Sequence, residues 1–272
     1  MKSRKVLLIA GMVVCSLFST INSNAQTDTV VAANVTSDPV QVTDNTGVEM
    51  NIIKLNLLSP FFKNISIQYE RVINKFLSVD LTVSFMPNTT LPYKNLLIKM
   101  TGYDDPAKED AIRGIKMSTY SISPEVRFYT GKKGYGKGFY VALSYRYSHF
   151  ELNKLTYIYA DYPAADSSVS FTGKMNVHYA GVLLGAQWFV GKHFTIDWWF
   201  FGPLVGYERS SVKGIASVPL SQEDQDDLRD YLEAINFPNT EKTINVDQYG
   251  ATVGLKGLMY GMRFGLALGF RF

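Results

Sequence analysis

Hydrophobic and polar residues alternate with a period of two along most of the chain beyond about residue 50. The clearest case is the last segment. Its even-numbered positions from Tyr260 to Phe272 are all apolar, and its odd-numbered positions are glycine, alanine or arginine. Successive side chains of a β-strand point to opposite faces, so this segment predicts a strand with one apolar face and one small or charged face.

The same alternation predicts seven further strands and an all-β fold. The eight predicted strands cover approximately residues 50–58, 64–73, 77–86, 117–130, 139–150, 175–190, 194–208 and 258–272. In the sixth we place outward Val182, Leu184, Ala186, Trp188 and Val190. In the seventh, Phe194, Ile196, Trp198 and Phe200 alternate with Thr195, Asp197, Trp199 and Phe201. Most of these segments reach the ~9–11 residues that a strand needs to cross a bilayer.

The connections between the predicted strands sort by length. Short turns follow the second, fourth and sixth strands, and long segments of about 30, 24 and 49 residues follow the third, fifth and seventh. Short turns at one end and long loops at the other are typical of outer-membrane barrels. An even strand count would place both termini on the periplasmic side.

Residues 246–258 also alternate, but Val253 and Leu255 fall on positions of opposite parity to the apolar face of the last strand. We expect a β-bulge near Lys256–Gly257, with the last strand protruding beyond the membrane. A barrel of ten strands is the alternative.

The N-terminus predicts export. Lys2, Arg4 and Lys5 precede an apolar stretch over residues 6–18, and Ser23 and Ala25 suit cleavage before Gln26. This pattern is typical of a secretory signal peptide over residues 1–25. The polar residues 26–49 predict a flexible segment, and residues 50–272 the barrel. We therefore expect a Gram-negative outer-membrane location after export through the inner membrane.

Charge and cysteine content exclude several classes of protein. Three of the 27 basic residues lie in the predicted signal peptide, which leaves 24 basic against 24 acidic residues. A neutral mature chain gives no reason to expect nucleic-acid binding. The single cysteine, Cys15, also lies in the signal peptide, so disulfides and thiolate metal sites are not expected.

With its alternating strands, sorted loops and terminal Gly269–Phe272, the chain resembles the small eight-stranded outer-membrane barrels of the OmpA, OmpX and OmpW kind. The resemblance covers roughly residues 50–272. It implies an antiparallel up-and-down transmembrane β-barrel with outer-membrane lipid around it. It also implies that the last strand carries the signal that the barrel-assembly machinery recognises. The residues of that signal would be Phe264, Leu266, Leu268, Phe270 and Phe272.

Charged residues on the inward faces predict how the barrel interior is filled. An eight-stranded barrel is only just wide enough for side chains. The inward charges are Lys54, Glu70, Asp80, Glu125, Arg127, Arg146, Asp197, Arg263 and Arg271. Charges enclosed in so narrow a space are costly unless they pair. We therefore expect a charge-paired plug and no open, porin-like channel.

Candidate catalytic chemistry is sparse. Some small barrels are lipid-modifying or proteolytic enzymes that use Ser/His or Asp/His arrangements near the outer rim. Here Ser148 and His149 are adjacent, so a strand would point them to opposite faces, although His178 could approach His149. His193 falls in a short turn, where we expect a structural role. We predict no catalytic residue, no cofactor and no metal site.

The last long loop predicts an amphipathic helix. Ser221–Asp224 resembles a capping box, and Phe237–Pro238 would end the helix. Its apolar stripe consists of Leu228, Tyr231, Leu232 and Ile235. A shorter helix is expected from Pro106 to Arg113. An apolar stripe must be buried, either against the barrel mouth or against a partner.

Three functions follow from these patterns. The first is a non-enzymatic outer-membrane barrel, structural or surface-binding, with a charge-plugged lumen and extracellular loops that bind an unknown partner. The second is a lipid-modifying or proteolytic barrel enzyme. The third is a transporter of small hydrophobic molecules with a lateral opening.

Overall fold

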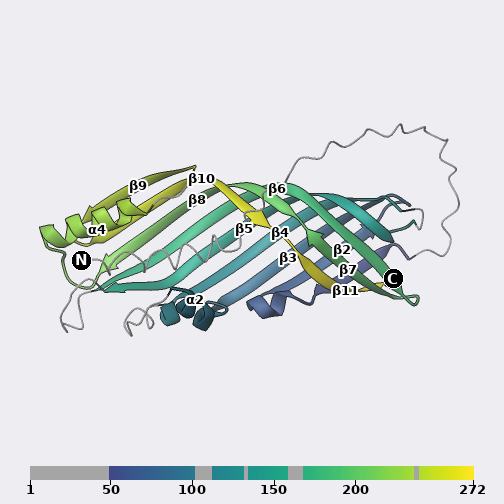
Figure 1. Cartoon of the computed structure of the whole chain (residues 1–272), viewed down its shortest axis with the longest axis horizontal. Coiled ribbons are helices and arrows are strands. Elements are labelled where there is room, and N and C mark those ends of the chain that lie inside the picture. Colours follow the sequence, from purple (N-terminus) through teal and green to yellow (C-terminus); the bar gives the residue numbers. More distant parts are fainter. Residues whose placement is uncertain (1–48, 102–111, 132–133, 159–167, 236–238) are drawn as a thin grey trace.

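The structure, a computed structural model, describes residues 49–101, 112–131, 134–158, 168–235 and 239–272. These residues form an antiparallel β-barrel, drawn from the side in Figure 1. The strands are β1 (Asn51–Asn56), β2 (Ile65–Val72), β3 (Leu77–Thr90), β4 (Lys116–Tyr129), β5 (Gly138–Ile158), β6 (Ser168–Val190), β7 (Phe194–Phe201), β8 (Pro203–Ala216), β9 (Thr240–Asp247), β10 (Gly250–Met262) and β11 (Gly265–Arg271). The described helices are η1 (Ser59–Phe62), α2 (Lys94–Thr101) and α4 (Gln222–Ala234).

Eight strands close the barrel, as predicted. The ring runs β1-β2-β3-β4-β5-β6-β7-β11 and returns to β1. β7 and β8 are two segments of one strand separated by Gly202, and β10 and β11 are likewise one strand with a short break. Among the described strands β9 pairs only with β10, so it is an added edge strand and the ten-stranded alternative is not needed.

The barrel has two halves that differ in their construction. We call the closed ring around β1, β2, β7 and β11 the short-turn half, because the tight turns before β3, β5 and β7 lie at its end. We call the remainder, with β8, β9, β10 and α4, the long-loop half. Several strands run further into this second half than predicted: β5 continues to Ile158, β6 begins at Ser168 and β8 continues to Ala216.

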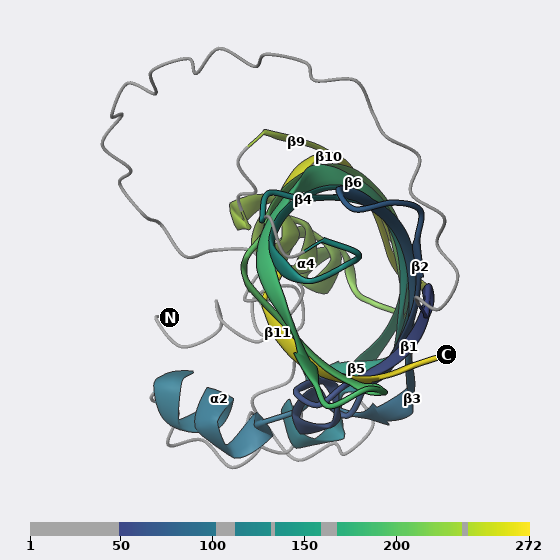
Figure 2. The ribbon, with the colours of Figure 1, turned by 90° about the vertical axis from the view of Figure 1, so that its right-hand side faces the viewer.

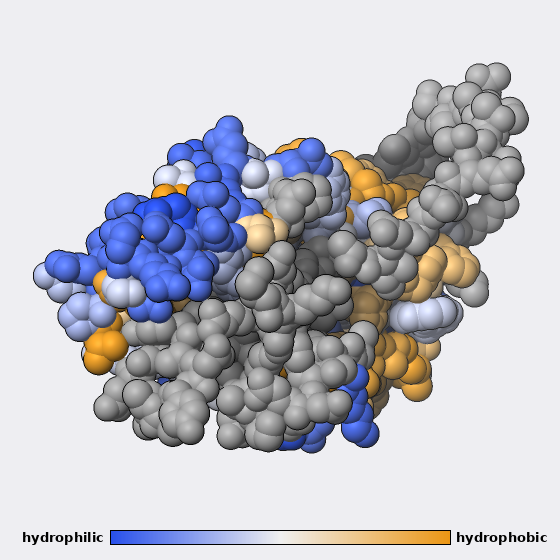
Figure 3. Space-filling view, turned by 60° about the vertical axis from the view of Figure 1, so that its left-hand side comes forward, coloured by the Kyte–Doolittle hydropathy of each residue, from blue (hydrophilic) through white to orange (hydrophobic). Residues whose placement is uncertain are grey.

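The polarity of the strand faces inverts between the halves. In the short-turn half the outward side chains are apolar and exposed, such as Leu81 at 44%, while inward neighbours such as Asp80 are buried. In the long-loop half, Val253 and Leu255 face inward and are buried, while Lys256 faces outward. Figure 3 shows the outcome, with hydrophilic residues over the long-loop half and hydrophobic residues beyond it.

The bulge predicted at Lys256–Gly257 is wrong. β10 pairs with β8 in an unbroken register from Gly250 to Met262, and odd-numbered residues face inward throughout β10 and β11. Val253 and Leu255 are apolar because the interior they face is apolar in this half of the barrel. The side-chain direction never changes; the environment does.

The irregularity lies instead in the seventh strand. The register of β6 against β7 shifts by one residue between Leu184 and Gly185, opposite Phe201 and Trp199. As a result, Phe200 and Phe201 both face outward, and Phe201 is 43% exposed where the alternation had placed it inward. This β-bulge restores the inward direction of the apolar residues further along β8. The predicted outward set of β6 keeps its parity, although Ala186 is shielded between its strand partners Phe139 and Trp198.

Helix α4 fills the interior of the long-loop half. Ser221 caps its N-terminus through the capping box with Asp224 that the sequence predicts. Its buried side chains pack with inward residues of the strands in one cluster, which contains Leu228, Tyr231, Leu232, Ile235, Leu155, Val169, Phe171, Val212, Val246, Val253 and Leu255. Viewed along the barrel, α4 lies within the outline of the strands (Figure 2). The apolar stripe is therefore buried against the barrel.

Lys242 contacts the C-terminus of α4. Nζ of Lys242, on β9, donates to the backbone carbonyl oxygens of Leu232 at 2.8 Å, Glu233 at 2.8 Å and Ile235 at 2.6 Å. The last carbonyls of a helix have no partner within the helix. Lys242 supplies that partner, and this ties α4 to the β9–β10 hairpin.

Other predictions fall partly or wholly outside the described residues. These include the signal peptide (1–25), nearly all of the N-terminal segment (26–49) and most of the predicted helix from Pro106 to Arg113. The described part of that helix, residues 112–113, is helical, and the helix continues to residue 114. Helix α2, which no pattern predicted, precedes that segment, and its Ile98 packs against Ile112. Among the helices described here, none has the length and apolar character needed to cross a membrane.

We expect Leu232→Ala to destabilise the long-loop half selectively. Truncating a buried leucine costs about 2–5 kcal/mol. Limited proteolysis should then cut this half faster, while the short-turn half stays protected. The control is Asp230→Ala on the exposed face of α4, which should leave the cleavage rate unchanged. Equal cleavage of both variants would contradict the role assigned to α4.

Candidate functional site: the charged lumen

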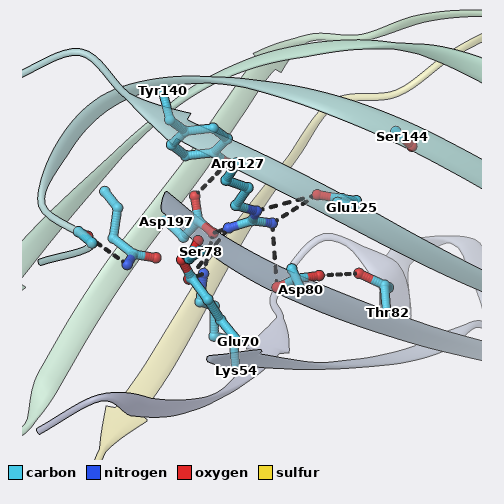
Figure 4. Close-up of polar contacts among 12 residues, drawn as sticks. Lys54, Glu70, Ser78, Asp80, Thr82, Glu125, Arg127, Tyr140, Ser144 and Asp197 are labelled. Atoms are coloured by element: carbon cyan, nitrogen blue, oxygen red, sulfur yellow. Dashed lines mark hydrogen bonds and ion pairs between the residues drawn. The ribbon is translucent and has the colours of Figure 1, made fainter. Parts of the chain in front are cut away.

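The interior of the short-turn half holds a network of ionised side chains, which we call the lumen network. Its members come from six of the eight strands of the ring, and Figure 4 shows most of them. They are Lys54 on β1, Glu70 on β2, Asp80 on β3, Glu125 and Arg127 on β4, Asp197 on β7, and Arg263 between β10 and β11. The alternation of each strand points these side chains inward, where the curvature of the barrel brings them together.

Arg127 is the centre of the network. Its guanidinium lies 2.6 Å from Asp197 Oδ2, 3.0 Å from Glu125 Oε2, 3.4 Å from Asp80 Oδ2 and 3.5 Å from Glu70 Oε2. The side chain is 0% exposed. The planar group also lies over the ring of Tyr140, 4.7 Å from its centroid. Five fixed N–H donors allow an arginine to engage carboxylates on several sides, which a lysine could not do in the same plane.

Lys54 joins two of the same carboxylates. Its Nζ lies 2.5 Å from both Glu70 Oε2 and Asp197 Oδ2. Two tyrosines complete these acids, since Tyr129 donates to Glu70 at 2.7 Å and Tyr140 donates to Asp197 at 2.8 Å. The hydroxyl of Ser78 donates a further short hydrogen bond to Glu70. The buried charges therefore have both opposite charges and neutral donors.

Three arginines reach different surroundings. Arg263 pairs with Glu125 at 2.7 Å, which attaches it to the lumen network. Arg146 also faces inward, but its guanidinium donates to the hydroxyls of Ser148 at 3.0 Å and Ser121 at 2.9 Å. Arg271 lies toward the short-turn end, over the ring of Phe189 and bonded to the carbonyl of Glu49. Seven of the nine predicted lumen charges thus meet in one network, and two do not.

A folded turn covers the short-turn end of the lumen. The described residues of the connection after β4 bend across the opening in Figure 2, and Gly134 and Gly136 among them are buried. Gln187 on β6 donates to the carbonyl oxygen of Gly136 at 2.7 Å. Nearby, the ring of Tyr140 lies so close to Gly185 that a Cβ there would meet it at 2.4 Å. Glycine is required at this position because the aromatic ring occupies the space of a side chain.

Sequence reasoning found the charges and missed their neutral partners. Tyr129, Tyr140 and Ser78 were on inward positions, but nothing in the alternation marked them as hydrogen-bond donors to buried acids. The available signal was their parity: Tyr129 lies two positions from Arg127 and Ser78 two positions from Asp80, and Tyr140 is the register partner of Tyr129. Each acid of the network contacts a cation or a neutral donor inside the barrel, so these side chains fill the lumen of the short-turn half.

Ser148 and His149 point to opposite faces. Ser148 is buried inside the barrel, whereas His149 lies outside, 5.0 Å from the ring of Tyr120, and bonds Asn176 at 2.6 Å. His178 also lies outside and bonds the hydroxyl of Tyr145 at 2.7 Å. The two histidines thus belong to a band of outward tyrosines. No serine or carboxylate is arranged with them as a catalytic dyad among the described residues, apart from Glu151, 3.4 Å from His149.

Glu151 marks the point where outward charges begin along β5. Lys174, whose Nζ lies 3.1 Å away, and then His149 lower the pKa of Glu151 by hydrogen bonding to its carboxylate. His193 lies in the turn before β7, 3.2 Å from Glu49, with its ring stacked on Phe270. Within the described ranges, no group of three or more His, Cys, Asp or Glu side chains is placed to hold a metal ion.

The residues proposed as an assembly signal share one face of the final strand. Phe264, Leu268, Phe270 and Phe272 are exposed on the outer surface, and Leu266 is half-buried between them. This face continues the apolar band of the short-turn half.

We expect Arg127→Met to be strongly destabilising. The substitution leaves carboxylates buried with too few cations, which costs about 3–5 kcal/mol. Unfolding should be followed as loss of the compact, fast-migrating form on unheated gels across a urea series. Arg209→Met is the matched control, because Arg209 is exposed on the outer face. Adding Asp80→Asn to Arg127→Met should recover part of the loss. No recovery and an unaffected single variant would each contradict a network centred on Arg127.

Comparison with known proteins gives a family. No curated protein matches the chain. A family model described as "Protein of unknown function (DUF3575)" matches residues 39–233, which include β1 to β8 and nearly all of α4. Since this match covers well over half of the 272 residues, the chain belongs to the DUF3575 family.

Proposed function

We propose that this protein is an integral outer-membrane β-barrel, with the short-turn half in the lipid and the long-loop half projecting from the cell surface. The observation that carries the proposal is the inversion of face polarity along the barrel. In water, a barrel with a charged interior and an apolar exterior would be unfavourable in both respects. In a bilayer the same half buries its apolar side chains against acyl chains.

The outer surface of the short-turn half suits a bilayer in height and composition. On β3, the outward apolar run from Leu77 to Phe85 matches the ~9–11 residues of a spanning strand. Phenylalanines such as Phe139 and Phe270 lie toward the short-turn end and tyrosines such as Tyr207 toward the long-loop half, with aliphatic residues between them. Aromatic side chains at both edges of an aliphatic band are typical of membrane barrels.

A row of polar outward residues supports the position of the outer boundary. Lys256 on β10 is the register partner of Arg209 on β8, which in turn partners Asn176 on β6, and Asn176 partners His149 on β5. Two residues closer to the short-turn end, Tyr207 partners Leu258 and His178. The change from apolar to polar therefore falls at the same level on four neighbouring strands.

We further propose a structural or surface-binding role without enzymatic activity. The lumen network and the folded turn after β4 support a barrel that conducts no ions. The apolar stripe of α4 is buried against the strands, so a partner would bind the polar outer surface of the long-loop half. The outward tyrosine contacts of His149 and His178 favour this role over a lipid-modifying or proteolytic enzyme.

The membrane position predicts that an added arginine is tolerated at one level and not at another. Leu81→Arg, in the apolar band, should lower folding stability in lipid vesicles by about 2–4 kcal/mol, as for an arginine near the bilayer midplane. Thr172→Arg, outward on β6 in the long-loop half, should change it little. The measurement is the folded fraction on unheated gels after urea titration in vesicles. Equal effects, or a wild-type barrel that is monomeric in buffer without detergent, would overturn the proposal.

The filled lumen predicts that the barrel conducts no ions across a bilayer. Purified protein inserted into planar bilayers should give no steady single-channel conductance, since paired side chains fill the cross-section around Arg127. An open porin inserted under the same conditions serves as the positive control, and protein recovery from the bilayer establishes insertion. Regular conductance steps from the wild type would contradict a closed barrel.

A further inference from the structure

A cavity of about 230 Å³ lies inside the barrel between the lumen network and the core around α4. Along β3 the inward residues pass from Asp80 in the network to Thr82, Ser84 and Met86, and the last three line the cavity. The floor of the cavity is thus polar and its upper wall is apolar. No step of the proposed membrane or surface role uses this space.

The polar lining contains groups that lack partners. Gln68 is 1% exposed, and neither its amide oxygen nor its amide nitrogen has a hydrogen-bond partner. The amide oxygen of Asn64 is unpaired as well. Both residues line the cavity. Buried polar groups without partners are rare in folded proteins and costly, so such groups at a cavity wall point to a molecule that completes them.

The same lining carries a cation without a carboxylate. Arg146 faces the cavity and donates only to the hydroxyls of Ser148 and Ser121, and no carboxylate of the described residues lies within ion-pair distance of it. Arg263 lines the cavity too, but Glu125 pairs with it. A partly buried guanidinium without an acidic partner favours an anion at hydrogen-bond distance. The chemistry of the cavity therefore selects negative charge.

The barrel wall beside this cavity has an unpaired stretch of backbone, which we call the window. β10 and β11 together form the eighth strand of the ring, and one of its edges faces β9 and then β1. On this edge, pairing with β9 ends at Gly257 and pairing with β1 begins at Ala267. Within the described part of the chain, residues 259–264 have no strand partner on this edge. Leu58 and Ser59 on one side of the window and Phe264 on the other line the cavity.

The window lies at the level of the apolar band. Outward neighbours on the same strand are Leu258, Tyr260 and Phe264, which are exposed. Unpaired backbone is tolerated at membrane depth only where it faces protein or a filled cavity. The enclosed volume is smaller than the roughly 300–1,000 Å³ of sites that surround a whole drug-sized ligand. It suits a head group and the start of a chain, with the rest of the chain passing through the window.

We propose that this cavity binds a single-chain anionic amphiphile, with its head group at Arg146 and Gln68 and its chain leaving through the window between β9 and β1. The inference rests on the proposed membrane location only for the source of the amphiphile. The anion site itself is defined by the cavity. Carboxylate and phosphate head groups share the chemistry that Arg146 requires, so the test includes both.

Trp199 provides a reporter for the test. It is 2% exposed and lines the cavity, whereas the other two tryptophans, Trp188 and Trp198, face outward. A barrel carrying Trp188→Phe and Trp198→Phe, in non-ionic detergent, should show saturable quenching of Trp199 by dodecanoic acid brominated at carbon 4. Bromine at carbon 12 should quench less, because that end lies beyond the window. The methyl ester of the carbon-4 compound is the uncharged control.

Two substitutions test the head-group site in this reporter protein. Arg146→Gln should weaken binding of the brominated acid about ten- to a hundredfold, as expected for a lost charge-assisted hydrogen bond. Gln68→Leu removes only unpaired polar atoms, so it should fold at least as well as the wild type and still weaken binding several-fold. Arg209→Gln, on the outer face, is the matched control and should leave binding unchanged. Unlabelled dodecanoate and dodecyl phosphate should both displace the probe, and their relative potency identifies the preferred head group.

Several outcomes would overturn the inference. They are equal quenching by the acid and its methyl ester, stronger quenching from carbon 12, and unchanged binding in Gln68→Leu together with Arg146→Gln. Should Arg146→Gln fail to fold, Gln68→Leu decides alone. If the barrel proves soluble without detergent, the same titration in plain buffer still tests the anion site, so failure of the membrane proposal and failure of this one are distinguishable.

Discussion

The structure depends on how Arg127 neutralises acids in a space that water cannot reach. One guanidinium contacts four carboxylates from β2, β3, β4 and β7, and Lys54 joins two of them from β1. These contacts cross the barrel and connect strands that are not neighbours in the sheet. Because the charged side chains pair with one another inside the barrel, none of them has to lie on the outer face. That face can therefore be apolar around the whole barrel.

The interior of the long-loop half is filled with apolar side chains instead of ion pairs. There the strands turn apolar side chains inward, and α4 supplies the apolar volume that completes the core. The outer face can then be polar. A single set of strands thus carries two interiors of opposite character, and the cavity beside Arg146 occupies the transition between them. Such a boundary is where neither ion pairing nor apolar packing is complete, which explains why unpaired groups such as Gln68 collect there.

Much of the fold followed from the period of two, because eight strands with one apolar face each restrict the possible arrangements to a few. The inward charges from Lys54 to Arg263 followed for the same reason. The strand ends did not, since β5 and β6 continue past the level where their outward faces become polar, and an apolar-outward pattern no longer marks them. The neutral donors Tyr129 and Tyr140 were missed because donor pairing depends on distances across the barrel. The apolar stripe of α4 was read correctly, but only the structure shows that the barrel covers it.

The bulge at Phe201 has a consequence for how this family could vary in length. Phe200 and Phe201 both point outward, so the seventh strand contains one residue more than a regular alternation would have. Loss of that residue would leave Trp199 and Leu204 on the faces they already occupy. A single-codon deletion or insertion elsewhere in this strand would turn every later side chain around, sending Glu208 outward and Tyr207 inward. The bulge is therefore a position at which the strand can lose one residue while its other side chains keep their inward or outward directions.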